Sequence, residues 1–189
     1  MITSETKNTS SKKQGMANSM LVFVWMSLAS GFGTGFIKIA PGTFGTSIGF
    51  IFWCGLVAIC SPVSIILSVA LFFLFSVFLS GWAAKRVGEK DPQWVVVDEW
   101  SAFIFVLSPW PLIIYSQSGE WPSLEIIFSD SKSYLILFVY FLTFRLFDIF
   151  KPLGISKLQN FPSGWGITLD DYAAAIPASI IGSLCLLYC

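Results

Sequence analysis

Three charged residues recur at every third position within an apolar stretch of the second half of the chain. They are Arg145, Asp148 and Lys151, and Pro152 follows directly. At about 100° per residue of an α-helix, this spacing places the three side chains on one face, and the proline ends the helix after Lys151. A charged stripe on an apolar helix is costly in a bilayer and indicates a functional site. The alternative is a buried Arg–Asp pair that only joins two helices.

Two pairs of adjacent acids stand directly before apolar runs, Asp98-Glu99 and Asp170-Asp171. A carboxylate at the start of a helix caps the first amides and interacts favourably with the helix dipole, so one such pair needs no further function. Two pairs that share one side of the molecule with Asp148 are more than capping requires. Crowded carboxylates repel one another unless a cation neutralises them. We therefore expect the five acids to surround a bound cation.

The chain contains no histidine, which excludes imidazole as base, nucleophile or metal ligand. Its cysteines have no metal-ligand spacing and are expected to be small apolar residues in helices; they are Cys54, Cys60, Cys185 and Cys189. A hard cation is then expected, and Mg²⁺ held by carboxylates, a substrate phosphate and water fits best. Arg145, Lys151 and Lys38 are the candidates to bind the phosphate oxygens. The candidate metal ligands are Asp98, Glu99, Asp148, Asp170 and Asp171, and all of these except Asp170 are also catalytic candidates.

Residues 31–46 form a glycine-rich segment that Pro41 interrupts, so we expect a loop there. Thr43 is predicted to cap the helix that follows, with the first amides facing the loop. Because helix N-termini bind phosphate oxygens, Gly42 and Thr43 are candidate substrate contacts. The segment is neither a P-loop nor a dinucleotide fingerprint, and the alternative is a turn that permits close helix packing.

The composition predicts an all-α polytopic membrane protein. The chain is 55% hydrophobic and 12% charged, with a mean hydropathy of +0.76, whereas soluble domains carry about 25% charged residues. The formal net charge is zero, so nucleic acid is not an expected partner. Residues 1–18 are polar and expected to be disordered, and residues 19–189 are expected to form one helical domain. Residues 20–30 are apolar but too short to cross about 30 Å of hydrocarbon. An interfacial or re-entrant helix is favoured over a signal peptide because the site-like loop at Gly31 follows at once.

The apolar runs predict about four membrane-crossing helices. Ser61-Pro62 separates the first two runs into a hairpin, and the first is short for a full span. Ser108-Pro109 interrupts the third run and predicts a kink or an early helix end. The runs cover residues 46–60, 63–84, 100–115, 134–150 and 172–188, with polar loops at 85–92, 116–132 and 154–169. No internal repeat is evident.

Basic residues outside the spans gather on one side of this predicted topology, and only Lys132 falls on the other. By the positive-inside rule the first side is cytoplasmic, and the five acids lie on that side. The nine residues on the cytoplasmic side are Lys7, Lys12, Lys13, Lys38, Lys85, Arg86, Lys90, Lys151 and Lys157.

Four blocks in this order resemble the phosphatidylglycerophosphatase A family. They are GFGTGFIKIAPGTFGT at 31–46, VVDEW at 96–100, FRLFDIFKP at 144–152 and GWGITLDDYAA at 164–174. The resemblance implies a Mg²⁺-dependent phosphatase of the bacterial inner membrane. Its substrate would be phosphatidylglycerophosphate, and its lipid product phosphatidylglycerol, on the way to anionic phospholipids. It also implies an all-helical fold.

Carried over by position, the resemblance makes the five acids the metal and catalytic candidates, with Arg145 and Lys151 as phosphate partners. The chain departs from the family at Lys38-Ile39, where proline or Pro-Lys is common, at Trp165, where a small residue is common, and at Ala175, where glycine is common.

Other mechanisms and functions are less consistent with the residues. A Cys-x5-Arg loop and an Asp-x-Asp motif are absent from the sequence, which leaves attack by a carboxylate-activated water, or direct attack by a carboxylate. An alcohol phosphotransferase would need a signature that is missing. A small membrane transporter or channel using the same acids stays open as the alternative, although carriers usually place their ion site near the membrane midplane.

Overall fold

The computed structural model describes residues 18–188. The predicted disordered segment therefore lies outside the described residues, apart from Asn18, which already belongs to the first helix, Asn18–Ala29. That helix is apolar and, at about 1.5 Å per residue, shorter than the hydrocarbon core. Its placement at the membrane interface stays a prediction.

All regular structure in the described part of the chain is helical, which confirms the predicted class. Five segments are long and apolar enough to cross a membrane, where about four were expected, because the first extends further than its apolar run. After the N-terminal helix the elements are η1 (Thr34–Phe36), α2 (Pro41–Ile59), α3 (Pro62–Val87), α4 (Val97–Leu107), α5 (Pro109–Ser118), α6 (Leu124–Ile127), α7 (Lys132–Phe150), η2 (Pro152–Asn160) and α8 (Gly164–Tyr188).

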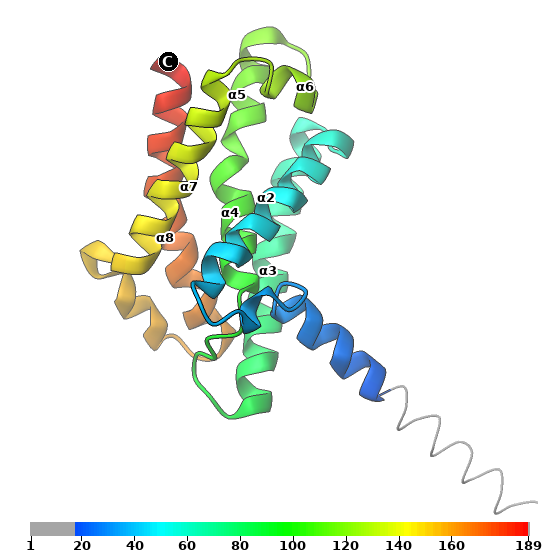
Figure 1. Cartoon of the computed structure of the whole chain (residues 1–189), viewed down its shortest axis with the longest axis vertical. Coiled ribbons are helices and arrows are strands. Elements are labelled where there is room, and N and C mark those ends of the chain that lie inside the picture. Colours follow the sequence, from blue (N-terminus) through cyan, green and yellow to red (C-terminus); the bar gives the residue numbers. More distant parts are fainter. Residues whose placement is uncertain (1–17, 189) are drawn as a thin grey trace, which may run out of the picture.

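Helix α4 occupies the centre of the bundle, and α2, α3, α7 and α8 pack around it (Figure 1). Beyond its acidic first turn its sequence is largely apolar on all faces, as expected for a helix enclosed by others, and Trp100, Phe103 and Ile104 are almost fully buried. About two thirds of the α4–α5 span is buried, against a third or less of the other four spans. The acidic residues at the start of α4 therefore lie where the surrounding helices converge.

Close packing of α2 on α4 depends on a glycine. A Cβ atom at Gly49 would overlap the backbone of Trp100, so the two helices approach as closely as small residues allow. Gly45, in the second half of the glycine-rich segment, is similarly confined, because a Cβ atom there would lie 2.8 Å from Cβ of Val96. The alternative of close helix packing therefore holds for this half of the segment.

The predicted loop at residues 31–46 ends earlier than expected, and Thr43 does not cap the next helix. Ala40 is the N-cap, with φ 51° and no capping side chain, and α2 begins at Pro41. Proline is favoured at the first helical position because its missing N–H is not needed there. Thr43 is thus the third residue of the helix.

The last helix also begins earlier than predicted, at Gly164 instead of after Asp171. The predicted loop at 154–169 is divided between η2 and the first turns of α8. Glycine at 164 and 166 weakens the helix signal, but Gly164 lies directly against the backbone of Val77 in α3, where no larger residue fits. The carboxyl groups of Asp170 and Asp171 therefore lie in the second turn of α8 and do not cap it.

Other predicted boundaries agree with the structure. Ser61 and Ser64 form a capping box at the start of α3. Ser108 keeps helical backbone angles between α4 and α5, so the interruption predicted at Pro109 separates two short helices within one span.

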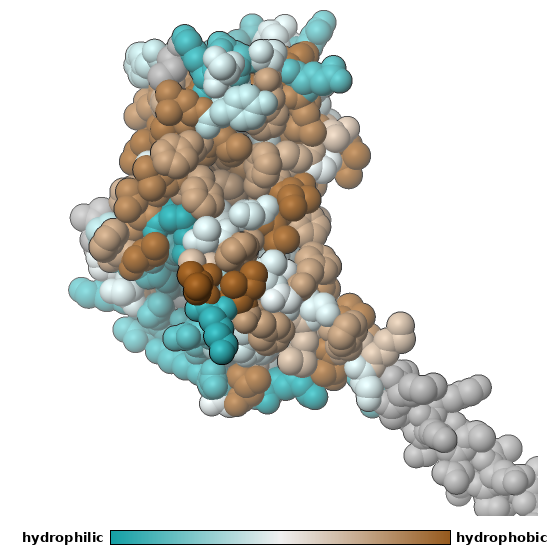
Figure 2. Space-filling model, viewed as in Figure 1, coloured by the Kyte–Doolittle hydropathy of each residue, from teal (hydrophilic) through white to brown (hydrophobic). Residues whose placement is uncertain are grey.

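The surface matches a membrane protein. Figure 2 shows a broad hydrophobic band around the middle of the molecule, with hydrophilic residues at both ends. The described basic residues gather at the end where α3 and α7 finish, and Lys132 stands at the opposite end, where α7 begins. The basic residues at the first end are Lys38, Lys85, Arg86, Lys90, Arg145, Lys151 and Lys157.

Candidate active site

A polar cavity of about 330 Å³ opens at the end of the bundle where α2 and α4 begin and α7 ends. All five predicted acids line it, together with Arg145, Lys151 and Gly42. The lining residues are Ala40, Pro41, Gly42, Asp91, Gln93, Val95, Asp98, Glu99, Arg145, Asp148, Lys151, Ile167, Asp170 and Asp171. Four segments far apart in the sequence thus supply a single site.

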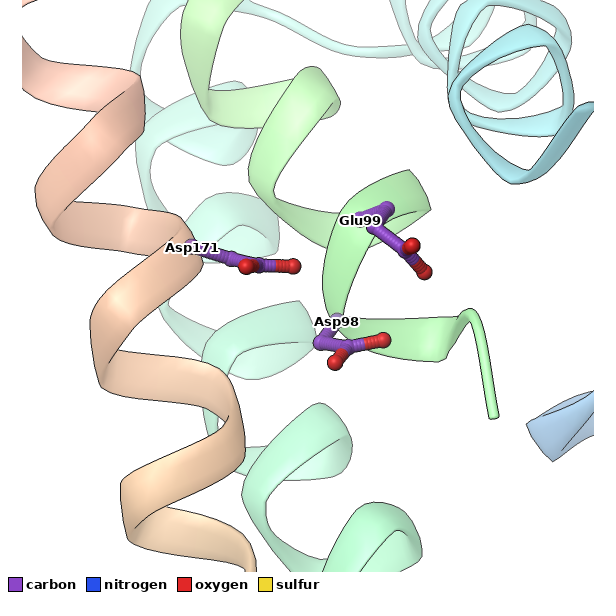
Figure 3. Close-up of side chains that lie close together, drawn as sticks. All are labelled: Asp98, Glu99 and Asp171. Atoms are coloured by element: carbon purple, nitrogen blue, oxygen red, sulfur yellow. The ribbon is translucent and has the colours of Figure 1, made fainter. Parts of the chain in front are cut away.

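Three of the acids form a cluster suited to a metal ion. Asp171 projects from α8 toward the start of α4, where Asp98 and Glu99 lie (Figure 3), and one oxygen from each of the three residues lies within 4.8 Å of the others. Each of the three also has a buried oxygen, Oδ1 of Asp98, Oε2 of Glu99 and Oδ2 of Asp171, that makes no hydrogen bond within the described residues. A buried polar atom without a partner is costly, and a hard divalent cation would satisfy all three.

The other two acids are held by the basic residues of the charged stripe. Nη1 of Arg145 lies 2.6 Å from Oδ2 of Asp148. Nζ of Lys151 contacts the Asp170 carboxylate and lies 3.2 Å from Oδ1 of Asp171 and 3.7 Å from Oδ1 of Asp148. The predicted single face for residues 145, 148 and 151 is therefore confirmed. Asp171 directs Oδ1 toward the lysine, and its Oδ2 has no hydrogen-bond partner among the described residues.

Lys151 is held in a backbone conformation that few non-glycine residues adopt. It ends α7 with φ 40° and ψ 54°, the left-handed region used at helix C-termini, and this turn directs its ammonium group back to α8. Burial lowers the pKa of Lys151, but the Asp171 and Asp170 carboxylates outweigh it and hold the pKa well above its usual value. The ammonium group therefore stays charged at neutral pH and cannot serve as a general base.

The charge balance of the cavity is strongly negative. Six acids and only two bases line it, so four negative charges are uncompensated when all the acids are ionised. A phosphate group also carries negative charge, and like charges repel strongly in a partly buried site. This charge disfavours the entry of a phosphate group and favours the binding of a cation.

Three polar residues near the site were not predicted from the sequence. Asp91 and Gln93 line the cavity from the segment between α3 and α4. Nε2 of Gln159, in η2, donates to Oδ2 of Asp170 at 2.7 Å. A polar loop preceding Asp98 could have suggested Asp91, but no sequence signal points to Gln159, because its position depends on how η2 folds back against α8.

Two predicted substrate contacts lie outside the cavity lining. Lys38 is exposed in the segment before α2, and Thr43 is half-buried. The backbone carbonyl of Thr43 accepts a hydrogen bond from Ser47. Their assignment to substrate binding stays a prediction.

Gly42 gives a direct test of the cavity, because a side chain there would intrude on two site residues. A Cβ atom at this position would overlap Oε1 of Glu99 and lie 2.9 Å from Nη2 of Arg145. We expect Gly42→Ala to lower the catalytic activity of this site by about 10²-fold, since small displacements of positioned groups have effects of that size. Activity of the purified variant is the measurement.

Gly55→Ala is the matched control, because the same substitution in the same helix meets open space. It should leave activity unchanged and raise stability by about 0.5–1 kcal/mol. Equal activity of the two variants would show that Gly42 is not tightly packed against the site.

Comparison with known proteins identifies relatives over most of the chain. The model of the family described as phosphatidylglycerophosphatase A matches residues 27–186. A Haemophilus influenzae protein named phosphatidylglycerophosphatase A is 32% identical over 180 residues, which cover 93% of this chain and 94% of that protein. An Escherichia coli protein of the same name is 28% identical over 153 residues, covering 80% and 77%.

A Bacteroides thetaiotaomicron protein bears a different name, "Putative phosphatidylinositol-3-phosphatase". It is 31% identical over 162 residues, covering 84% of this chain and 91% of that protein. No solved structure matches the chain.

Proposed function

The chain belongs to the phosphatidylglycerophosphatase A family, and from this premise we propose that it is a Mg²⁺-dependent phosphatase that converts phosphatidylglycerophosphate to phosphatidylglycerol and phosphate. The family makes it an enzyme that acts on a lipid phosphate. Dependence on Mg²⁺ and a place in phospholipid synthesis are the parts that we propose.

The three-acid cluster is the observation that carries the proposal. Asp98, Glu99 and Asp171 offer closely spaced oxygens, each residue with one buried oxygen that no described residue satisfies. Oxygen ligands without histidine or cysteine favour Mg²⁺ over softer metals. We assign these three residues as the metal ligands. When bound, Mg²⁺ would stabilise the charge that develops on the phosphoryl group and acidify a coordinated water.

The remaining charged residues would position the ligands and the substrate. Arg145 and Lys151 present donors at the edge of the cavity while their pairing with Asp148 and Asp170 fixes their orientation. Arginine is well suited to a phosphate because its planar fork donates two hydrogen bonds. The amide of Gly42, in the first turn of α2, adds the positive end of a helix dipole.

The reaction then needs one base and one water. A carboxylate oxygen of the cluster accepts a proton from the water, the water oxygen bonds to phosphorus, and the bond between phosphorus and the glycerol oxygen breaks. The leaving oxygen takes the proton that the carboxylate had accepted from the water, so the carboxylate is regenerated and the products are a lipid alcohol and inorganic phosphate. Lys151 is protonated throughout and contributes charge, not base strength.

Placement in the bacterial inner membrane, with the cavity facing the cytoplasm, is supported by the charge distribution. The described basic residues lie almost entirely at the cavity end of the bundle, which the positive-inside rule assigns to the cytoplasm. The relatives named above are bacterial.

A second lipid monophosphate also merits testing. The relative from Bacteroides thetaiotaomicron carries the name of a phosphatase for phosphatidylinositol-3-phosphate, and a cavity that grips a terminal phosphate does not by itself define the alcohol attached to it. Transport through the same acids is less favoured, because they line an opening at one end of the bundle and a carrier site is expected near the midplane.

The test measures phosphate release by the purified protein from phosphatidylglycerophosphate, phosphatidylinositol-3-phosphate and phosphatidic acid. We expect release from the first lipid, loss of that activity in excess EDTA, and its return when Mg²⁺ exceeds the chelator. Activity that persists in EDTA would exclude the metal assignment, and preference for phosphatidylinositol-3-phosphate would replace the proposed substrate.

A further inference from the structure

An apolar groove lies between α2 and α7, with α4 as its floor. Its volume is about 260 Å³. Phe103 of α4 is almost fully buried at its base, whereas Phe138 and Tyr134 of α7 are more than half exposed along one side. The groove is lined by Ser47, Phe50, Phe103, Tyr134, Leu137, Phe138 and Phe141.

The groove continues the polar cavity along the same three helices. Phe103 lies four residues beyond Glu99 on α4, and Phe141 and Phe138 lie four and seven residues before Arg145 on α7. These spacings place the groove residues on the helix faces that carry the site residues. At about 1.5 Å per residue, the groove residues of α7 lie roughly 6 to 17 Å from Arg145 along the helix, toward its start. The far end of the groove is therefore about as distant from Arg145 as the thickness of one leaflet of a hydrocarbon core about 30 Å thick.

The seam between α2 and α7 is open to the side of the bundle. Both helices pack against α4 or α8, but they are not a closely packed pair with each other, and Figure 1 shows α4 between them. The surface at this level belongs to the hydrophobic band in Figure 2. A lipid in the bilayer could therefore reach the groove without leaving the membrane.

We propose that this groove binds one acyl chain of the lipid substrate, which enters laterally between α2 and α7 so that its terminal phosphate meets the three-acid cluster. This inference rests on the proposed function and adds to it a site for the hydrophobic part of the substrate. The acyl chain is the chosen occupant because the groove is apolar, lies about one helical turn beyond the charged cavity on the same three helices, and falls within the membrane-spanning length of α2 and α7.

A larger apolar cavity elsewhere serves as a comparison. It has a volume of about 590 Å³, and its lining residues are Leu28, Phe52, Leu56, Ser68, Leu71, Phe72, Phe75 and Trp100. These come from the N-terminal helix, α2, α3 and α4, and none comes from α7 or α8. It therefore does not continue the arrangement of Arg145, Asp148 and Lys151, and we assign it no part in holding the substrate.

The experiment places a bulky side chain in each apolar space. Ser47→Trp fills the groove from an exposed position on α2, where the native hydroxyl bonds only to the carbonyl of Thr43. Leu71→Trp, also at an exposed position, fills the comparison cavity. Each purified protein is assayed on phosphatidylglycerophosphate with long acyl chains and on the deacylated, water-soluble head group with its terminal phosphate.

We expect Ser47→Trp to reduce kcat/KM for the long-chain lipid by at least about 10-fold and to leave hydrolysis of the deacylated head group within about twofold of wild type. Leu71→Trp should match wild type on both substrates. Equal lipid activity of wild type and Ser47→Trp would overturn the groove assignment, as would equal losses on both substrates. If the wild type hydrolysed neither substrate, that result would instead overturn the proposed function.

A lipid with a photoreactive acyl chain gives a second readout that does not depend on turnover. Labelling of the wild type is expected in peptides that contain residues 134–141 or 47–50, and Ser47→Trp should reduce it. Labelling confined to peptides that contain Leu56 or Leu71 would place the chain in the comparison cavity and contradict the proposal.

Discussion

Asp171→Asn should abolish metal-dependent phosphate release, with a fall in kcat of about 10³-fold. Removing one preorganised electrostatic contact from an active site has effects of that order. Asp171 belongs to the three-acid cluster, and its Oδ2 is one of the three buried oxygens without a partner among the described residues. The variant should also bind Mn²⁺, as a spectroscopic substitute for Mg²⁺, far more weakly in electron paramagnetic resonance titrations.

Glu89→Gln is the control for this result, because it removes one negative charge at the same end of the bundle from an exposed side chain that does not line the cavity. It should retain wild-type activity and metal affinity. Near-normal turnover by Asp171→Asn in protein that still inserts and folds would remove Asp171 from the reaction.

Asp148→Asn separates the two groups of acids. The Asp148 carboxylate is paired with Arg145 and lies near Lys151, so its loss should misplace the arginine fork while the cluster of Asp98, Glu99 and Asp171 stays intact. We expect activity to fall about 10–100-fold, the usual effect of losing a residue that orients a site, with metal affinity changed much less. A loss of metal affinity as large as that of Asp171→Asn would make Asp148 a ligand.

The sequence predicted which residues gather at the site better than it predicted which acids form the three-acid cluster and which pair with Arg145 and Lys151. Spacing on one helix placed residues 145, 148 and 151 together, because helical geometry is local. The pairing of Lys151 with Asp170 depends on the left-handed backbone at the end of α7 and on the contact of α7 with α8. Sequence periodicity contains neither.

Helix starts were predicted least well where glycine and proline were read as loop. Pro41 starts α2 and Gly164 starts α8, and in each case close packing on a neighbouring helix decides the boundary. This shift changes the interpretation of Asp170-Asp171, because a pair in the second turn of a helix cannot be explained as capping. The cavity explains its burial by the contacts of both acids with Lys151 and, in our proposal, by a cation bound to Asp171.

Lys151→Met should be the most destabilising substitution in the site. Its ammonium group neutralises the Asp170 carboxylate, whose side chain is only 2% exposed, and also faces Asp171 and Asp148. Removing one partner of a buried pair costs about 3–5 kcal/mol, and we expect the lower value because the lysine side chain is 19% exposed. Because the pKa of Lys151 in the folded state is raised above the value of about 10 expected for the unfolded chain, its stabilisation is complete below about pH 10 and is lost only as the pH rises through the higher folded-state value.

The double variant Lys151→Met with Asp170→Asn distinguishes a structural role from a functional one. Removing the charge of the Asp170 carboxylate, which has lost its lysine partner, should recover more than half of the lost stability, measured by unfolding in detergent. Activity should not recover, because the cavity still lacks the Lys151 ammonium group that would hold the substrate phosphate. The defect should appear as a raised KM with metal affinity retained. If the double variant regained wild-type KM, Lys151 would serve only to balance the charge of Asp170, and Arg145 would be the only one of the two basic residues that binds the substrate phosphate.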